Sequence, residues 1–211
     1  MSAKVFTIAQ QKGGAGKSTL AAHLAIAWML TGKSVALVDI DPQGSVASWH
    51  AQRVKTLGEG ETGLTFTQVT GWRTSAEVEK LAALHDIVVI DSPPHAETEA
   101  KIAVRVADLV IVPAQPSPLD VWATVPTLEL ASKEKSPVVM VLNRVPPRSN
   151  LTARMITKLG GYRVKVAKAM LGNRVAFAEA MASGRTALET KPRSVASKEM
   201  VALAAELLKQ A

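Results

Sequence analysis

The sequence predicts a doubly wound α/β fold, in which a mainly parallel sheet is flanked by helices on both faces. Short apolar runs rich in β-branched residues alternate with longer helical patterns almost from end to end, and this alternation is typical of right-handed βαβ units. Runs such as Ile-Val-Val-Ile at 87–90 are apolar throughout, which indicates strands buried on both faces. A length of 211 residues, with no recognisable linker, repeat or low-complexity segment, predicts one domain covering 1–211.

Each element is expected from the spacing of its apolar residues. The runs that predict strands are 5–9, 35–39, 64–69, 87–91, 109–113 and 138–143. The segments that predict the helices between them are 17–31, 44–55, 75–84, 97–107 and 119–132. Past residue 150 the pattern becomes mainly helical, at 151–159, 173–183 and 196–209, with a short strand expected at 162–166.

The composition excludes several classes of protein. With 47% apolar and 20% charged residues, the chain is neither disordered nor fibrous. The absence of cysteine excludes disulfides, Cys-ligated zinc, iron–sulfur clusters and thiol catalysis, and it favours a cytoplasmic location. The longest uncharged stretch, 18–32, is 15 residues long, shorter than the ~20 residues that span a bilayer. The first residues lack the apolar segment of a signal peptide.

The strongest local motif is Lys-Gly-Gly-Ala-Gly-Lys-Ser-Thr at 12–19, directly after a predicted strand and at the start of a predicted helix. Glycines let successive backbone N–H groups turn inward around a phosphate, and the helix directs its positive end toward it. Lys17 is expected to reach the β- and γ-phosphates of ATP, and the Ser18 hydroxyl to complete the shell of a magnesium ion. The residues expected to bind ATP here are Gly13, Gly14, Ala15, Gly16, Lys17, Ser18 and Thr19. The alternative is a glycine turn that only joins strand to helix.

The loop departs from the usual G-x-x-x-x-G-K-[ST] pattern, because Gln11 stands where the first glycine belongs and Lys12 follows it. This resembles the deviant Walker-A loop, K-G-G-x-G-K-[ST], of the ParA/MinD family of P-loop ATPases. The resemblance implies a homodimer with two ATP molecules sandwiched at its interface, where Lys12 reaches the partner's nucleotide. Added positive charge would offset the repulsion between two triphosphates. The alternative is a lysine that is merely exposed on a loop.

Two carboxylates follow the second predicted strand, in Asp-Ile-Asp-Pro-Gln at 39–43. Open α/β sheets bind ligands at the carboxyl ends of their strands. The family resemblance assigns this segment to switch I, with Asp41 orienting the attacking water and Asp39 supporting the magnesium site. Lys12, Lys17 and Asp41 are then the expected catalytic residues. The alternative is that the two aspartates cap the next helix.

Two further strand ends complete the expected site. Asp91 follows four apolar β-branched residues, which fits a Walker-B aspartate that holds magnesium through a water. Asn143 and Arg144 at the end of the sixth predicted strand resemble the family's Asn-Arg element, which implies contacts with ATP. The amide of Asn143 would read the adenine edge, since it can donate and accept at once. A turn-forming asparagine is the alternative.

The net charge of +7 is concentrated in one part of the chain. Between Glu134 and Glu179 there are nine basic residues and no acidic one, which leaves 16 basic and 18 acidic residues elsewhere. Such a block suits contacts with the phosphates of DNA, without sequence readout, and the resemblance implies non-specific DNA binding by the ATP dimer. The alternative is an ordinary solvated surface. The candidate DNA contacts, in the block and near the C-terminus, are Arg154, Lys158, Arg163, Lys165, Lys168, Arg174, Arg193 and Lys198.

The resemblance implies an ATPase of slow intrinsic rate that partitions or positions a cargo over the bacterial nucleoid. The cargo would be a plasmid, a chromosome region or a large protein assembly, and a ParB-like protein or cargo adaptor would stimulate hydrolysis. One alternative is a MinD-like membrane switch, but the C-terminal segment lacks the aromatic residues and rich basic face of a membrane-binding helix. A metabolic P-loop ligase or kinase is the other. No membrane partner is expected.

Overall fold

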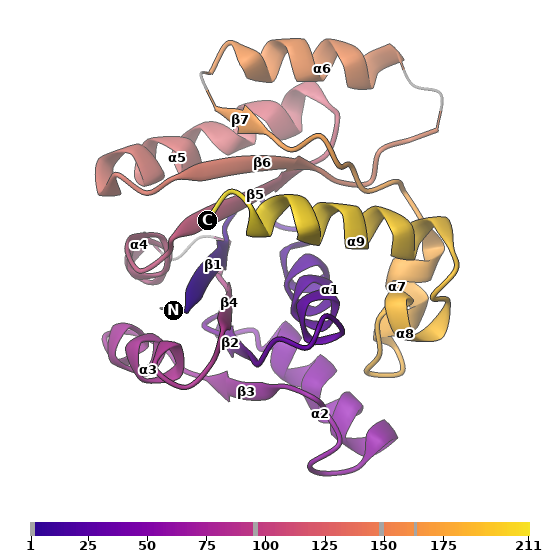
Figure 1. Ribbon diagram of the computed structural model, residues 1–211. Coiled ribbons are helices and arrows are strands. Elements are labelled where there is room, and N and C mark those ends of the chain that lie inside the picture. The colour runs from indigo at the N-terminus through magenta and orange to yellow at the C-terminus, as the bar shows by residue number, and fades with distance from the viewer. Residues whose placement is uncertain (1–2, 95–96, 148–149, 163) are drawn as a thin grey trace.

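The computed structural model describes residues 3–94, 97–147, 150–162 and 164–211. Within these residues a seven-stranded sheet has the order β3-β2-β4-β1-β5-β6-β7, and every pair of neighbouring strands is parallel (Figure 1). The strands are β1 (Lys4–Ile8), β2 (Val35–Asp39), β3 (Thr65–Gln68), β4 (Ile87–Asp91), β5 (Leu109–Ala114), β6 (Val138–Leu142) and β7 (Lys165–Val166). The predicted doubly wound parallel fold is confirmed.

Helices cover both faces of the sheet, as Figure 1 shows. They are α1 (Lys17–Met29), α2 (Ser45–Leu57), α3 (Arg73–Ala82), α4 (Glu97–Arg105), α5 (Pro118–Glu134), α6 (Asn150–Gly160), α7 (Val175–Met181), α8 (Ala187–Thr190) and α9 (Val195–Leu208). Buried residues of α1, α2, α7, α8 and α9 pack in one core with strand residues such as Phe6 and Leu37. Buried residues of α3, α4, α5 and α6 pack in two smaller cores on the opposite face, with strand residues such as Val88 and Val110.

Helix α9 lies against α1 (Figure 1), and it belongs to the core. Its apolar residues Met200, Leu203 and Leu207 are buried, and the indole of Trp28 on α1 donates a hydrogen bond to the carbonyl of Ala204. Within the described ranges, no helix is both long enough and apolar enough to cross a membrane.

Two predicted elements differ from the structure. The expected strand 162–166 is reduced to Lys165–Val166, because α6 ends in a turn in which the Tyr162 amide donates to the Leu159 carbonyl. The expected helix 173–183 begins only at Val175, because the Asn173 amide still donates to the Val145 carbonyl beyond β6. After α7 the chain turns at Gly184, whose φ is +66°, and continues into α8.

Candidate functional site

The phosphate loop lies at the carboxyl end of β1 and leads directly into α1. Gly14 and Gly16 have φ values of +76° and +91°, a conformation that favours glycine. Gly16 caps α1 without any side-chain hydrogen bond to the first turn, so the helix presents backbone N–H groups and its positive end at this point. A Cβ added at Gly13 or Gly14 would meet nothing within 4 Å. The loop is therefore an open cradle of the kind that holds a phosphate chain.

Lys17 is the first residue of α1, directly after this loop, and it is only 7% exposed. Burial lowers its pKa, while the nearby charges of Asp91 and Asp41 act to raise it. The ammonium is therefore close to the carboxylates at the end of β4 and just after β2. A charged amine held in this position can stabilise the negative charge that develops on a phosphoryl group during its transfer.

Asp91, at the end of β4, is completely buried. Neither of its carboxylate oxygens accepts a hydrogen bond from any residue that the structure describes. Burial raises the pKa of Asp91 to about 7, and the Ser18 hydroxyl opposes this rise only in part. A buried carboxylate whose hydrogen-bonding capacity is not filled is costly, so the site fits a cation that would supply positive charge.

A hard cation such as magnesium prefers oxygen ligands and usually keeps waters and substrate phosphates in its shell. The Ser18 hydroxyl and the Asp91 carboxylate are oxygen donors of this kind. In the described part of the chain, no cluster of three or more His, Asp or Glu side chains could bind a metal by itself. The donor set therefore fits magnesium bound together with a phosphorylated ligand.

Asp39 and Asp41 organise the segment that follows β2. The two carboxylate oxygens of Asp39 accept backbone N–H groups of Asp41 and Ala47, at 3.0 and 2.9 Å. Asp41 is 6% exposed, and its Oδ1 accepts the backbone N–H of Gln43 at 2.9 Å. The contacts of Asp39 match the helix-capping alternative, because Ala47 lies in the first turn of α2.

Lys12 forms an ion pair within its own chain. Its Nζ lies 2.8 Å from Oδ2 of Asp120, in the first turn of α5. The Lys12 side chain is 38% exposed, whereas that of Asp120 is 6% exposed. The sequence predicted neither Asp120 nor this contact, because 108 residues separate the two positions.

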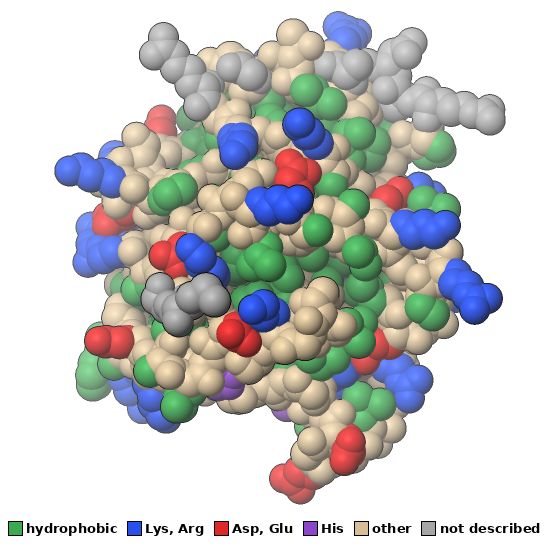
Figure 2. All heavy atoms as spheres, viewed as in Figure 1, with side chains coloured by type: hydrophobic (Ala, Val, Ile, Leu, Met, Phe, Trp, Pro, Cys, Tyr) green, Lys and Arg blue, Asp and Glu red, His purple; other side chains and the backbone are tan. Residues whose placement is uncertain are grey.

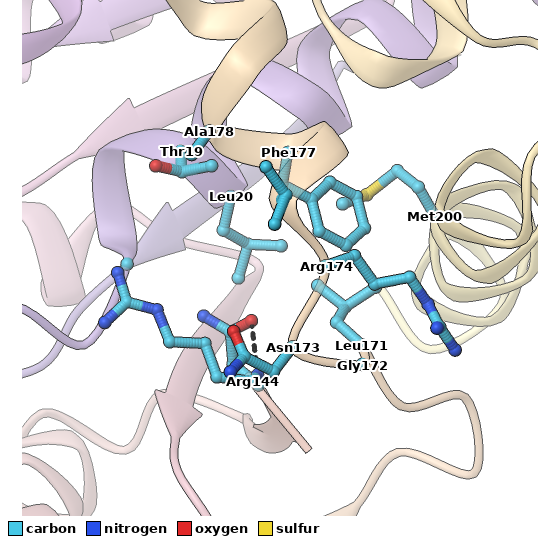
Figure 3. A pocket seen from close by; sticks show the side chains of 13 residues that line it. Thr19, Leu20, Arg144, Leu171, Gly172, Asn173, Arg174, Phe177, Ala178 and Met200 are labelled. Carbon is cyan, nitrogen blue, oxygen red and sulfur yellow. Dashed lines mark hydrogen bonds between the residues drawn. The ribbon is translucent and has the colours of Figure 1, made fainter. Parts of the chain in front are cut away.

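A cavity of about 290 Å³ opens beside the phosphate loop. Figure 3 shows the apolar side chains of Leu20, Leu171, Phe177 and Met200 converging on it, while Arg144 and Arg174 extend outward on opposite sides. Thr19, Asn143 and Asn173 contribute polar groups to its wall. An apolar slot with a few polar groups is suited to a flat heterocyclic ring. The sequence did not identify the wall formed by 171–178, because this segment carries no motif.

Asn143 lies between the cavity and the phosphate loop. Its Nδ2 donates to the Ala15 carbonyl at 2.9 Å, and its Oδ1 accepts the backbone N–H of Arg144 at 2.9 Å. A Cβ at Gly16 would lie 2.6 Å from Nδ2 of Asn143. In this structure the amide therefore holds the loop, and contact with an adenine edge stays a prediction.

The candidate DNA contacts are spread over several elements. Arg154 and Lys158 are exposed on α6, and Lys165 on β7, while Arg193 and Lys198 are exposed near α9. Arg163 lies outside the described residues. The ammonium of Lys158 lies 5.1 Å from the centre of the Trp122 ring, a distance at which a cation and an aromatic ring attract.

The acid-free stretch of sequence is not an acid-free surface. Glu199 of α9 pairs with Arg174 at 2.6 Å, and Glu206 accepts the backbone N–H groups of Lys168 and Ala169. Figure 2 shows Lys and Arg side chains scattered over this side of the molecule, with Asp and Glu side chains between them. The count of charges between Glu134 and Glu179 did not include Glu199 and Glu206, because α9 follows that stretch in the sequence.

Comparisons with known proteins agree with this geometry. Residues 6–187 match the family model described as the CobQ/CobB/MinD/ParA nucleotide binding domain. The chain is 30% identical over 190 residues to Maintenance of carboxysome distribution protein A of Halothiobacillus neapolitanus, and the match covers 86% of each chain. It is 26% identical over 250 residues to the sporulation initiation inhibitor protein Soj of Bacillus subtilis, covering 97% of this chain and 98% of Soj.

A solved structure shares the fold across nearly the whole chain. A complex of a Cyanothece McdA variant with ATP matches with a TM-score of 0.82 at 17% identity, and the match covers 98% of this chain and 96% of that one. The resemblance to ParA and MinD proteins is confirmed by the family match, which spans most of the sequence. The chain belongs to the CobQ/CobB/MinD/ParA nucleotide-binding family.

Proposed function

We propose that this chain is an ATP-hydrolysing switch that dimerises with ATP and positions or partitions a large cargo in a bacterial cell. The observation that carries the proposal is the buried carboxylate of Asp91, whose oxygens have no hydrogen-bond partner within bonding geometry, close to Lys17 of an open phosphate loop that contains two lysines. Such a site is incomplete without a polyanion and a cation. Family membership and the carboxysome-distribution and Soj relatives support the positioning role.

Each residue of the site has a proposed task. Bound ATP and magnesium would supply the transferable phosphoryl group and neutralise its charge. The N–H groups of residues 13–19 would cradle the phosphates, Lys17 would stabilise charge on the γ-phosphate, and Ser18 and Asp91 would hold the cation. Asp41 would orient the attacking water, while Asp39 holds Asp41 through its backbone N–H. The base would enter the slot lined by Leu20 and Phe177.

The proposed dimer depends on Lys12. In the single chain this lysine pairs with Asp120, and in the dimer it would exchange that carboxylate for the phosphates of the partner's nucleotide. Exposure of Gly13 and Gly14 at the tip of the loop supports an approach by a second subunit at this surface. Lys12→Ala should leave nucleotide binding but abolish the ATP-dependent dimer, measured by light scattering.

Non-specific DNA is the proposed surface on which the dimer is retained, over the nucleoid. The exposed cations Arg154, Lys158 and Lys165 support this, and dimerisation would double their number. Arg174 is the weakest candidate, since Glu199 already pairs with it. Affinity for DNA should then fall by about 0.9 log unit per log unit of salt for each phosphate contact.

The cargo is proposed to be a large protein assembly or a DNA molecule, recognised through a separate adaptor protein that stimulates hydrolysis. The carboxysome-distribution relative supports the first, and the similarity to Soj over nearly the whole chain keeps chromosome partition as the second candidate. A membrane switch is less well supported, because the apolar face of α9 is buried against α1.

The deciding experiment measures ATP hydrolysis, dimerisation and DNA binding of the purified chain with ATP, ADP and no nucleotide. The proposal expects DNA binding only with ATP, and expects Asp41→Ala to bind DNA persistently because it cannot hydrolyse ATP. Vesicles of anionic lipid serve as the alternative partner in flotation assays. ATP-dependent flotation without DNA binding would replace this proposal with the membrane switch, and the absence of ATP hydrolysis would refute both.

A further inference from the structure

Helix α2 begins directly after the Asp41 segment and packs against α1, β2 and β3. Its buried residues are Val46, Trp49 and Arg53. The Trp49 indole donates to the Arg185 carbonyl at 3.2 Å, and Arg53 contacts Gly184 and Glu189. Two of its three buried residues therefore hold α2 to the segment 184–189, far along the chain.

Arg53 is held on every side. Its Nε donates to the Thr62 carbonyl at 2.8 Å, and Nη1 donates to the Gly184 carbonyl at 3.1 Å. Oε2 of Glu189 accepts a hydrogen bond from Nη1 at 3.1 Å, and Oε1 of Glu189 lies 2.8 Å from Nη2. The guanidinium also lies 5.5 Å from the centre of the Trp49 ring. With the Arg53 side chain 2% exposed, this bidentate pair is shielded from water and geometrically specific.

The backbone at Gly184 fits closely against α2. A Cβ at Gly184, where φ is +66°, would lie 2.2 Å from the Arg53 backbone nitrogen. No side chain fits at that distance. Segment 184–189 therefore holds α2 through close backbone packing as well as through the Arg53–Glu189 ion pair.

The same segment is fixed at its other end to the phosphate-loop helix. Glu189 closes a capping box with Thr186 at the start of α8. The Ala187 amide donates to Nε2 of His23 at 3.1 Å, and Nδ1 of His23 contacts the Thr19 carbonyl at 2.8 Å. Segment 184–189 therefore joins α1, which begins at the phosphate loop, to α2, which begins at the Asp41 segment.

Movement of α2 would act directly on Asp41. The Ala47 amide in the first turn of α2 donates to Asp39, and the other oxygen of Asp39 accepts the Asp41 amide. The Gly44 amide, at the N-cap of α2, donates to the Asp41 carbonyl at 2.9 Å. The position of Asp41 relative to the phosphate loop is thus tied to the seat of α2.

We propose that Arg53 and Glu189 are positioning residues, whose buried ion pair clamps α2 so that Asp41 is held at the distance from the phosphate loop that hydrolysis requires. The inference rests on the proposed ATPase activity and assigns it two residues remote from the nucleotide. A misplacement of about 1 Å in a catalytic group can cost about 100-fold in rate, so a loosened clamp should lower kcat.

The test compares Arg53→Met and Glu189→Gln with wild type. Both variants should lose about tenfold or more in kcat, with the affinity for ATP unchanged within about twofold. Lys191→Met is the matched control, because Lys191 pairs with Glu179 at 2.7 Å near the same segment but on the exposed surface. The control should keep wild-type kcat. The melting temperature of each protein is measured first, and kcat is then compared at a temperature at which all of them are folded.

A second readout does not depend on activity. Backbone amide exchange of the peptide covering 39–48 should become faster in both variants and stay unchanged in the control, because the amides of Asp41 and Ala47 lose a fixed partner. Wild-type kcat and wild-type exchange in Glu189→Gln, which keeps the shape of the side chain, would overturn the clamp. If the wild type itself does not hydrolyse ATP, the proposed function fails and the exchange measurement alone decides on the clamp.

Discussion

His23 provides a quantitative test of how tightly α1 is joined to α8. The ring is completely buried, with Nδ1 2.8 Å from the Thr19 carbonyl and Nε2 accepting the Ala187 N–H at 3.1 Å. A carbonyl can only accept and an N–H can only donate, so these partners assign the proton to Nδ1 of a neutral ring. Burial lowers the pKa of His23 from 6.5 to about 4, against the opposing effects of the Thr19 carbonyl and the charge of Glu189.

The sign and size of the effect follow from this pKa. The unfolded chain takes up a proton near pH 6.5, and the folded chain does so only near pH 4, so folding becomes less favourable as the pH falls through this interval. The difference of about 2.5 pH units corresponds to about 3 kcal/mol. This part of the stability is fully present above pH 6.5 and fully lost below pH 4.

The measurement is the free energy of unfolding of wild type and His23→Asn, from urea titrations at several pH values between 8 and 4. Fluorescence of the buried Trp28 and Trp49 reports unfolding. The difference between the two proteins is the relevant quantity, because Asp91 acts in the opposite direction. Its raised pKa makes the folded state bind a proton at higher pH than the unfolded chain, which favours folding as the pH falls.

Subtraction removes Asp91 and every other group that the two proteins share. Wild type should lose its advantage over the variant by about 3 kcal/mol between pH 7.5 and pH 4. A difference that stays constant over this range would refute the account of His23 as a buried neutral link. Nitrogen chemical shifts of the ring at pH 6 give an independent check, since they distinguish the neutral Nδ1–H tautomer from the charged ring.

Three further changes test the site. Asp91→Asn should remove the magnesium dependence of nucleotide affinity, because it removes the buried carboxylate that would hold the cation; an affinity for ATP that still depends on magnesium would contradict this. Gly16→Ala should abolish nucleotide binding, measured by fluorescence titration, because φ is +91° and the new Cβ would lie 2.6 Å from Asn143; unchanged affinity would argue against the cradle. Asp120→Asn should lower the ATP concentration needed for dimerisation in light scattering, because it releases Lys12; a higher required concentration would show that Asp120 assists the dimer.

Much of the fold and the phosphate site could be predicted from the sequence, because their signals are local. Continuous apolar runs predicted β2, β4 and β5. The strands β1 to β6 all lie close to their expected ranges. The glycine-rich loop, Asp39 and Asp91 all follow strands whose carboxyl ends share one edge of a parallel sheet. Parallel pairing alone then brings these residues together.

The rest depends on contacts between distant segments, which no local pattern encodes. Phe177 and Met200 line the cavity beside Gly16 only because α7 and α9 fold back over α1. Glu199 reaches the basic stretch in the same way. Nothing in the local sequence distinguishes Gly184 from other turn glycines, although its backbone packs directly against Arg53 of α2.

The Lys12–Asp120 pair bears on how the proposed dimer would form. The Lys12 side chain is 38% exposed, so it can reach solvent, whereas its partner Asp120 is only 6% exposed. Asp120 is not left without partners when Lys12 leaves it, because its Oδ2 also accepts the Ser117 hydroxyl. A triphosphate offers a much stronger field than one carboxylate. In the proposed dimer the phosphates of the partner's nucleotide would replace Asp120 as the contact of Lys12, so formation of the dimer would depend on bound ATP.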